Sequence, residues 1–356
     1  MKKTLKTKRK PQERSLSQTM TIPTQQFGKG LDVGTAFIYA AQKVGDAVAF
    51  RIERDAFLDI PYNDHLKTIF ERDNVRYIEK DNQLYAIGNG ALRFANLFQR
   101  SVRRPLERGV MSPKEKEALP IIKLIIENVL GSHRHPGEIV YYSIPAEPID
   151  ADFDVLYHQH IINDFLFGLG YTPKPIHEGL AVIYAELAEE NFTGLGLSFG
   201  GGMTNVCLAN LSVPVVNFSI ARGGDWIDKQ VARVVNQPVS AVTAWKESNL
   251  NLDKKEHPSR IEQALSIYYD ILLEYVIGHL KQELEASAAH LEKPLSVVVT
   301  GGTAKPNGFL KRFQEALASA QLPFEVERVF LAPQLLHSVA KGALIAAIAD
   351  ESKRKL

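Results

Sequence analysis

The sequence contains one local pattern twice, and this repeat constrains the fold more than any other feature. Residues 27–60 predict a strand, a Gly-Thr turn, a second strand and a third strand. Residues 194–220 repeat the order of strand, glycine-rich turn, strand, turn and strand. Helical spacing of apolar residues follows in both halves. The sequence therefore predicts an α/β protein with two duplicated domains.

The repeat also divides the chain of 356 residues, which is long enough for two domains. We expect residues 1–26 to form a basic, disordered tail. Residues 27–193 are expected to form the first domain. Residues 194–331 are expected to form the second domain.

Charge and composition exclude several classes of protein. The net charge is only +1, so no global field favours nucleic acid or membrane. The first fourteen residues nevertheless hold seven basic residues and one acidic residue, a net charge of +6. They contain no apolar run, so they predict neither a signal peptide nor an amphipathic anchor. A solvated arm is the main interpretation, and contact with DNA or anionic lipid is the alternative.

The single cysteine, Cys207, excludes an internal disulfide and is typical of a reducing compartment. No apolar run approaches the roughly 20 residues that a membrane-spanning helix needs. We therefore expect a cytoplasmic protein without a transmembrane segment.

The two glycine turns suggest a site for phosphate. Glycine lets backbone N–H groups approach an anion closely, and a duplicated domain places two such turns face to face across a cleft. Asp32, beside the first turn, is well placed to hold Mg²⁺ through water. Neither a Walker loop nor a dinucleotide fingerprint is present. A nucleotide clamped by its phosphates is one interpretation, and a tight hairpin is the alternative for the glycine cluster alone.

Five stretches, in one order along the chain, resemble the ATPase superfamily of actin, heat-shock chaperones and sugar kinases. They are "GLDVGTA" (30–36), "LSFGGGMTNV" (197–206), "IARGGDWID" (220–228), "VVVTGGTAKPNGFL" (297–310) and "VAKGALIAA" (339–347). Two more, "RRPLERGVM" (103–111) and "HEGLAVIYA" (177–185), resemble bacterial actins of the MreB and ParM type. The resemblance implies two ribonuclease-H-like α/β domains with a nucleotide cleft between them. It also implies that residues 332–356 complete the first domain.

The resemblance also implies roles for individual residues, with ATP and Mg²⁺ as cofactors. Asp32 corresponds to the acid that holds Mg²⁺ through water, and Glu178 to the catalytic group that orients the attacking water. A helix-terminal acid is the alternative interpretation of Glu178. The residues expected at the phosphates are Gly34, Thr35, Gly200, Gly201, Gly202 and Thr204. Those expected at the adenosine are Gly224, Lys246, Glu247, Gly301, Gly302 and Thr303, although Lys246 and Glu247 can also be read as solvated side chains.

Two departures from the family pattern affect the expected function. Ser198 stands where the family usually carries an acid that organises Mg²⁺, which implies weaker metal binding and slow hydrolysis. The stretch between the helices near residues 248 and 259 is short, which implies a reduced outer subdomain within residues 194–331.

Three functions follow from the resemblance. The first is an ATP-binding, actin-like protein whose copies assemble head to tail into cytoskeletal filaments for cell shape, DNA segregation or organelle positioning. The second is a scaffold or adaptor that binds ATP without polymerising. The third is a small-molecule kinase. The MreB-like context of residues 103–111 favours the filament, whereas Ser198 and the short outer segment favour the adaptor.

Overall fold

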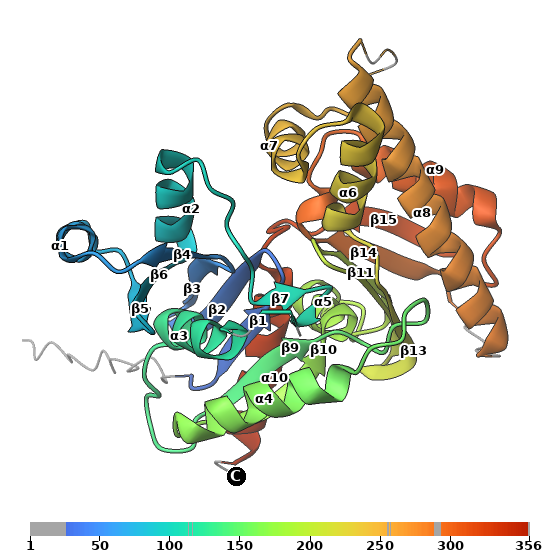
Figure 1. Cartoon of the computed structure of the whole chain (residues 1–356). Helices are drawn as coiled ribbons and strands as arrows, with labels where there is room; N and C mark the ends of the chain where they lie inside the picture. Colours follow the sequence, from blue (N-terminus) through green and yellow to red (C-terminus); the bar gives the residue numbers. More distant parts are fainter. Residues whose placement is uncertain are drawn as a thin grey trace, which may run out of the picture.

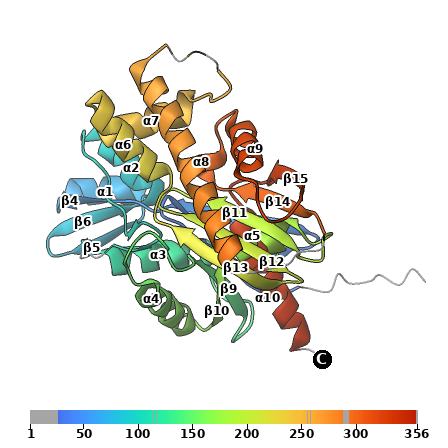
Figure 2. The same cartoon turned by 90° about the vertical axis from the view of Figure 1, so that its right-hand side faces the viewer.

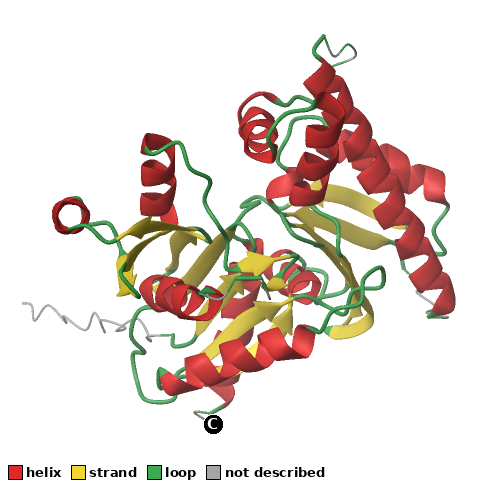
Figure 3. Ribbon diagram, in the orientation of Figure 1, coloured by secondary structure: helices red, strands yellow, loops and turns green. Residues whose placement is uncertain are grey.

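The computed structural model describes residues 26–112, 114–115, 117–254, 256, 258–287 and 293–354. The expected basic tail lies outside the described residues, except for Gln26. The molecule has two halves, each built on one five-stranded sheet with helices packed against it (Figure 1). Figure 3 shows the same mixture of helices and strands in both halves.

The sheet of the first half has the strand order β10-β9-β1-β2-β3. Its strands are β1 (Lys29–Val33), β2 (Phe37–Val44), β3 (Ala47–Arg54), β9 (Ile139–Ile144) and β10 (Thr172–His177). The first three form an antiparallel meander, and β9 pairs in parallel with β1. Helices α3 (Ala118–Leu130) and α4 (Val155–Gly168) bury their apolar side chains against this sheet.

The sheet of the second half repeats this topology in the order β13-β12-β11-β14-β15. Its strands are β11 (Gly194–Phe199), β12 (Thr204–Asn210), β13 (Val213–Ile220), β14 (Leu295–Thr300) and β15 (Val326–Leu331). Again the first three form an antiparallel meander, and the fourth pairs in parallel with the first. The predicted duplication of an α/β architecture is thus confirmed.

Helices α6, α7, α8 and α9 complete the second half. Their bounds are Gly224–Val235, Val239–Asn249, Arg260–Ala286 and Phe309–Ala320, and a short 3-10 helix, η1, spans Gly302–Ala304. Figure 2 shows the long helix α8 crossing the second sheet, with α9 beside it. Between α6 and α8 the described residues form α7 and contain no strand.

The first half carries an insertion after β3. Three strands in the order β4-β6-β5 form a small separate sheet, and two helices and a hairpin accompany it. The elements are β4 (Phe57–Pro61), α1 (Asp64–Arg72), β5 (Tyr77–Lys80), β6 (Gln83–Ile87), α2 (Gly88–Leu97), β7 (Leu106–Glu107) and β8 (Val110–Met111). A hairpin at Asp81-Asn82 joins β5 to β6, and these two residues have positive φ angles of 49° and 58°.

Two helices lie where the halves meet, α5 (Glu178–Glu186) and α10 (Ser338–Lys353). Helix α10 lies very close to β1 on one side and to α5 on another. A Cβ on Gly30 of β1 would lie 2.1 Å from the carbonyl oxygen of Ala340. A Cβ on Gly342 of α10 would lie 1.7 Å from the carbonyl oxygen of Ala181 in α5. Small residues thus allow backbone-to-backbone packing at the centre of the molecule.

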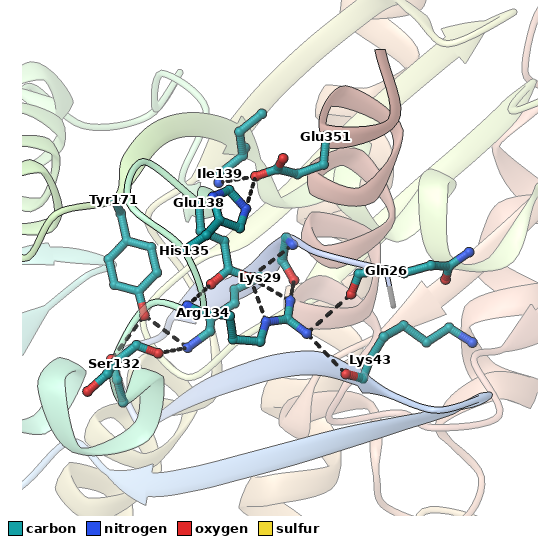
Figure 4. A network of polar contacts seen from close by, with 12 residues as sticks. Gln26, Lys29, Lys43, Ser132, Arg134, His135, Glu138, Ile139, Tyr171 and Glu351 are labelled. Atoms are coloured by element: carbon teal, nitrogen blue, oxygen red, sulfur yellow. Dashed lines mark hydrogen bonds and ion pairs between the residues drawn. The ribbon is translucent and has the colours of Figure 1, made fainter. Parts of the chain in front are cut away.

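A polar network fixes the chain where the described residues begin (Figure 4). The Arg134 guanidinium donates to the carbonyls of Gln26 and Gly28, at 3.2 and 2.8 Å, and pairs with buried Glu138. The buried Lys29 ammonium donates to the carbonyl oxygens of Leu130 and Ser132 and to the Tyr171 hydroxyl. Burial lowers the pKa of Lys29 to about 8, although Glu138 opposes the shift.

None of the helices in the described part of the chain combines the length and the apolar character that a membrane span requires.

Candidate functional site

A cavity lies between the two halves, and both halves contribute to its wall. The first glycine turn, between β1 and β2, faces the second glycine loop, between β11 and β12. Further parts of the lining come from the start of α5, the start of α6, α7, the turn after β14, Arg104 and the chain around the start of α10. The predicted site residues in this wall are Asp32, Gly34, Thr35, Glu178, Gly200, Gly201, Gly202, Gly224, Lys246, Glu247, Gly301, Gly302 and Thr303.

Thr204 is the predicted site residue that does not line the cavity. It begins β12 and is fully buried, and its hydroxyl donates to the carbonyl of Arg222 at 2.9 Å. The hydroxyl therefore ties the second glycine loop to the end of β13.

The glycines of the wall fall into two kinds. Gly301 has φ +101°, and a Cβ there would lie 2.2 Å from the carbonyl oxygen of Phe199, so the fold itself requires glycine. Gly201 and Gly302 differ, because the nearest atoms to an added Cβ would be 3.7 Å away on Ala36 and 3.8 Å away on Leu336. Internal packing does not require glycine at these two positions. Their bare backbone leaves room for the close approach of a ligand.

The two glycine loops meet beside the β7–β8 hairpin, which contacts both of them. The backbone N–H of Gly109, in that hairpin, donates to the Thr35 hydroxyl at 3.0 Å. A Cβ on Gly202 would lie 2.5 Å from the same hydroxyl and 2.9 Å from the Cα of Arg108. The first turn, the hairpin and the second loop therefore form one contact across the two halves.

Two half-buried carboxylates face the cavity, Asp32 and Glu178. The Ser143 hydroxyl donates to Asp32 Oδ1 at 2.9 Å, and the Ser198 hydroxyl donates to Glu178 Oε2 at 2.9 Å. Burial raises the pKa of Asp32 to about 7, and the Ser143 hydrogen bond opposes that shift. Burial and then the charge of Asp32 raise the pKa of Glu178 to about 8.

The neighbours that oppose these pKa shifts are neutral polar groups, so a cation from outside the chain would relieve both acids. Oxygen donors of this kind suit Mg²⁺, which keeps much of its water shell. Within the described ranges, no group of three or more His, Cys, Asp or Glu side chains is arranged to hold a metal ion. The acids thus fit a magnesium ion that takes most of its ligands from water and phosphate.

Sequence reasoning missed an ion pair in the cavity wall. Arg104 Nη1, from the first half, donates to both carboxylate oxygens of Asp225 at 3.0 and 2.8 Å. The backbone N–H of Asp225 in turn donates to the carbonyl of Gly201 at 2.8 Å, so the pair is joined to the second glycine loop. Both residues lie in stretches that resemble the family, but they are 121 positions apart and nothing local indicates their pairing.

Lys246 and Glu247 both lie in the wall but in different environments. Lys246 Nζ donates to Asp228 Oδ2 at 2.9 Å and to the Gly224 carbonyl at 3.2 Å, so its charge is used inside the protein. Asp228, which sequence reasoning also missed, accepts a further bond from the Thr243 hydroxyl at 2.7 Å. Glu247 is exposed at the rim.

Similarity to solved structures identifies the class. The MamK double helical filament has a TM-score of 0.69 at 15% identity, with 90% of this chain and 98% of that chain covered. MreB5 of Spiroplasma citri bound to ADP has a TM-score of 0.65 at 19% identity, covering 94% of this chain and 99% of that chain. The ethanolamine utilization protein EutJ from Carboxydothermus hydrogenoformans has a TM-score of 0.51 at 16% identity, covering 90% and 89%. The protein has the actin-like ATPase fold, as its motifs predicted.

The family can be stated more narrowly. A family model described as volactin matches residues 27–347, so the chain belongs to the volactin family. No curated protein matches the chain.

Proposed function

We propose that this protein binds ATP with Mg²⁺ in the cavity and assembles head to tail into filaments that depend on the nucleotide. The observation that carries the proposal is the bare backbone of Gly201 and Gly302 in a wall that also presents the half-buried carboxylates of Asp32 and Glu178. Anions bind readily where backbone N–H groups are accessible, and glycine permits that approach. The structures of MamK as a double helical filament and of MreB5 bound to ADP, which share the fold, support both parts of the proposal.

Each group in the wall has a proposed role. The two glycine loops and Thr35 would hold the phosphates, while the turn at Gly301-Gly302 and the start of α6 would border the adenosine. Asp32 would hold Mg²⁺ through water, and the ion would neutralise phosphate charge. Glu178 would orient the attacking water and accept its proton, a task that suits a pKa of about 8. Lys246 would contribute its aliphatic stem, since Asp228 engages its charge.

A second candidate is an ATP-binding scaffold that does not polymerise. The observation in its favour is the small outer part of the second half, where α7 alone separates α6 from α8 among the described residues. Filament contacts that need further strands there would be lost. No comparable observation favours the kinase.

Sedimentation and negative-stain microscopy of the full chain with ATP, ADP or no nucleotide test the proposal. We expect filaments with ATP and Mg²⁺, and fewer or none with ADP. Nucleotide binding is followed in parallel by ATP-induced thermal stabilisation. A protein that binds ATP but stays monomeric at every concentration supports the scaffold, and one that does not bind ATP refutes both candidates.

Two matched glycine variants localise the site. Gly201→Ala adds a Cβ that meets no protein atom closer than 3.7 Å, so the fold should persist while phosphate contact is lost. Gly278→Ala, in α8, adds a Cβ that meets nothing within 4 Å apart from the adjacent backbone of its own helix, and it lies outside the cavity wall. We expect Gly201→Ala to lose ATP-induced stabilisation and filaments, and Gly278→Ala to keep both. Equal ATP binding by the two variants would contradict the assignment of the cavity.

A further inference from the structure

Ser198 has a position in the structure that its sequence alone did not reveal. It lies near the end of β11, where it pairs with Asn205 of β12 and Thr300 of β14. Only 3% of the residue is exposed, and it lines the cavity. Sequence reasoning treated it only as the loss of an acid.

The hydroxyl of Ser198 does more than fill space. It donates to Glu178 Oε2 at 2.9 Å and therefore fixes the carboxylate at the first turn of α5. A similar bond exists in the first half, where the Ser143 hydroxyl donates to Asp32 Oδ1 at the same distance. Each of the two acids is thus held by one buried serine from a neighbouring central strand, β9 or β11.

Charge explains why a hydroxyl suits this position. Burial and then the charge of Asp32 already raise the pKa of Glu178, so ionising this carboxyl is costly. A third carboxylate at position 198 would add like charge and could not donate a hydrogen bond while ionised. Serine supplies the donor and adds no charge.

We propose that Ser198 is a positioning residue, which holds the Glu178 carboxylate in the orientation that accepts a proton from the attacking water. In that step the water oxygen bonds to the γ-phosphorus, the bond from phosphorus to the ADP oxygen breaks, and the water proton passes to Glu178. Ser198 itself touches neither the water nor the phosphate in this role. The inference rests on the proposed ATPase function.

Steady-state hydrolysis and ATP binding of the full-length variants test this role. Ser198→Ala should lower kcat about tenfold and change the Kd for ATP less than twofold, because only the orientation of the base is lost. Ser198→Thr keeps a hydroxyl and should restore kcat to within about twofold of the original protein. Ser198→Asp should hydrolyse no faster than Ser198→Ala, because it replaces the donor by a charge.

A buried serine elsewhere provides the control. Ser296 of β14 is 2% exposed, and its hydroxyl contacts Arg328 instead of the cavity, so Ser296→Ala should leave kcat unchanged. Equal kcat in Ser198→Ala and the original protein would overturn the inference, as would a rise in kcat in Ser198→Asp. If the original protein binds ATP but does not hydrolyse it, the inference about Ser198 is overturned, whereas the proposed nucleotide binding stands. Absence of ATP binding would instead refute the proposed function.

Discussion

Replacing Gly342 by alanine tests the contact that joins α10 to α5. Helix α10 packs against β1 of the first sheet and against α5, and α5 packs against β11 and β12 of the second. A Cβ on Gly342 would lie 1.7 Å from the carbonyl oxygen of Ala181 and 2.5 Å from its carbonyl carbon. Both atoms belong to the backbone of a helix, so no side chain can rotate to make room.

Two opposing effects set the change in the free energy of unfolding that Gly342→Ala causes. Alanine is favoured over glycine in a helix interior by about 1 kcal/mol, which would stabilise the variant. Overpacking a well-filled core costs about 1–3 kcal/mol and occasionally more. A Cβ at 1.7 Å requires the two helices to move apart by more than an ångström, so the cost lies at the upper end. We expect the free energy of unfolding to fall by about 2 kcal/mol.

The assay is urea unfolding followed by circular dichroism, with Gly278→Ala as the matched control. An added Cβ at Gly278 meets nothing within 4 Å apart from the adjacent backbone of its own helix, so only the helical preference acts there. We expect that variant to gain up to about 1 kcal/mol. A gain in both variants would refute the close contact between α5 and α10.

Two further predictions concern the cavity wall. The side chains of the Arg104–Asp225 pair are 31% and 29% exposed, so the pair should contribute modestly to stability. A double-mutant cycle with Arg104→Ala and Asp225→Ala, measured by urea unfolding, should give a coupling energy of about 1 kcal/mol that shrinks at high salt. A coupling energy of zero would contradict the ion pair. Folding raises the pKa of Glu178 from 4.5 to about 8. Between these two pH values Glu178 is protonated in the folded chain and ionised in the unfolded chain. The free energy of unfolding without ligand should therefore fall as the pH rises from 4.5 to about 8. Glu178→Gln should flatten the slope in urea unfolding between pH 5.5 and 8, and an unchanged slope would assign it to another group.

Local patterns predicted most of the fold. The two meanders are recognisable because each strand borders its neighbour in sequence, and the first turn of each carries glycine. The parallel strands that complete the two sheets, β9, β10, β14 and β15, lie outside that repeat. The residues that the motif resemblance predicted for the site all line one cavity, apart from Thr204.

Contacts between distant residues could not be predicted in the same way. The bond from Ser198 to Glu178 depends on how α5 packs beside β11, which no spacing within either stretch reveals. Thr204 shows a related limit, because its neighbours in sequence indicate a phosphate loop while its hydroxyl bonds the Arg222 carbonyl. In both cases the direction of one side chain decides the role, and tertiary packing sets that direction.

The contacts around the cavity explain how a ligand there could act on the whole molecule. Thr35 belongs to the first half, yet it contacts the hairpin at Gly109 and lies against Gly202 of the second half. The Arg104–Asp225 pair crosses the same boundary. Any rotation of one sheet against the other must change these contacts together, whereas α5 and α10 allow little sliding because their backbones touch. A ligand that contacts both glycine loops therefore binds one relative position of the halves more tightly than others, and that difference in affinity is the free energy available to favour one assembly state.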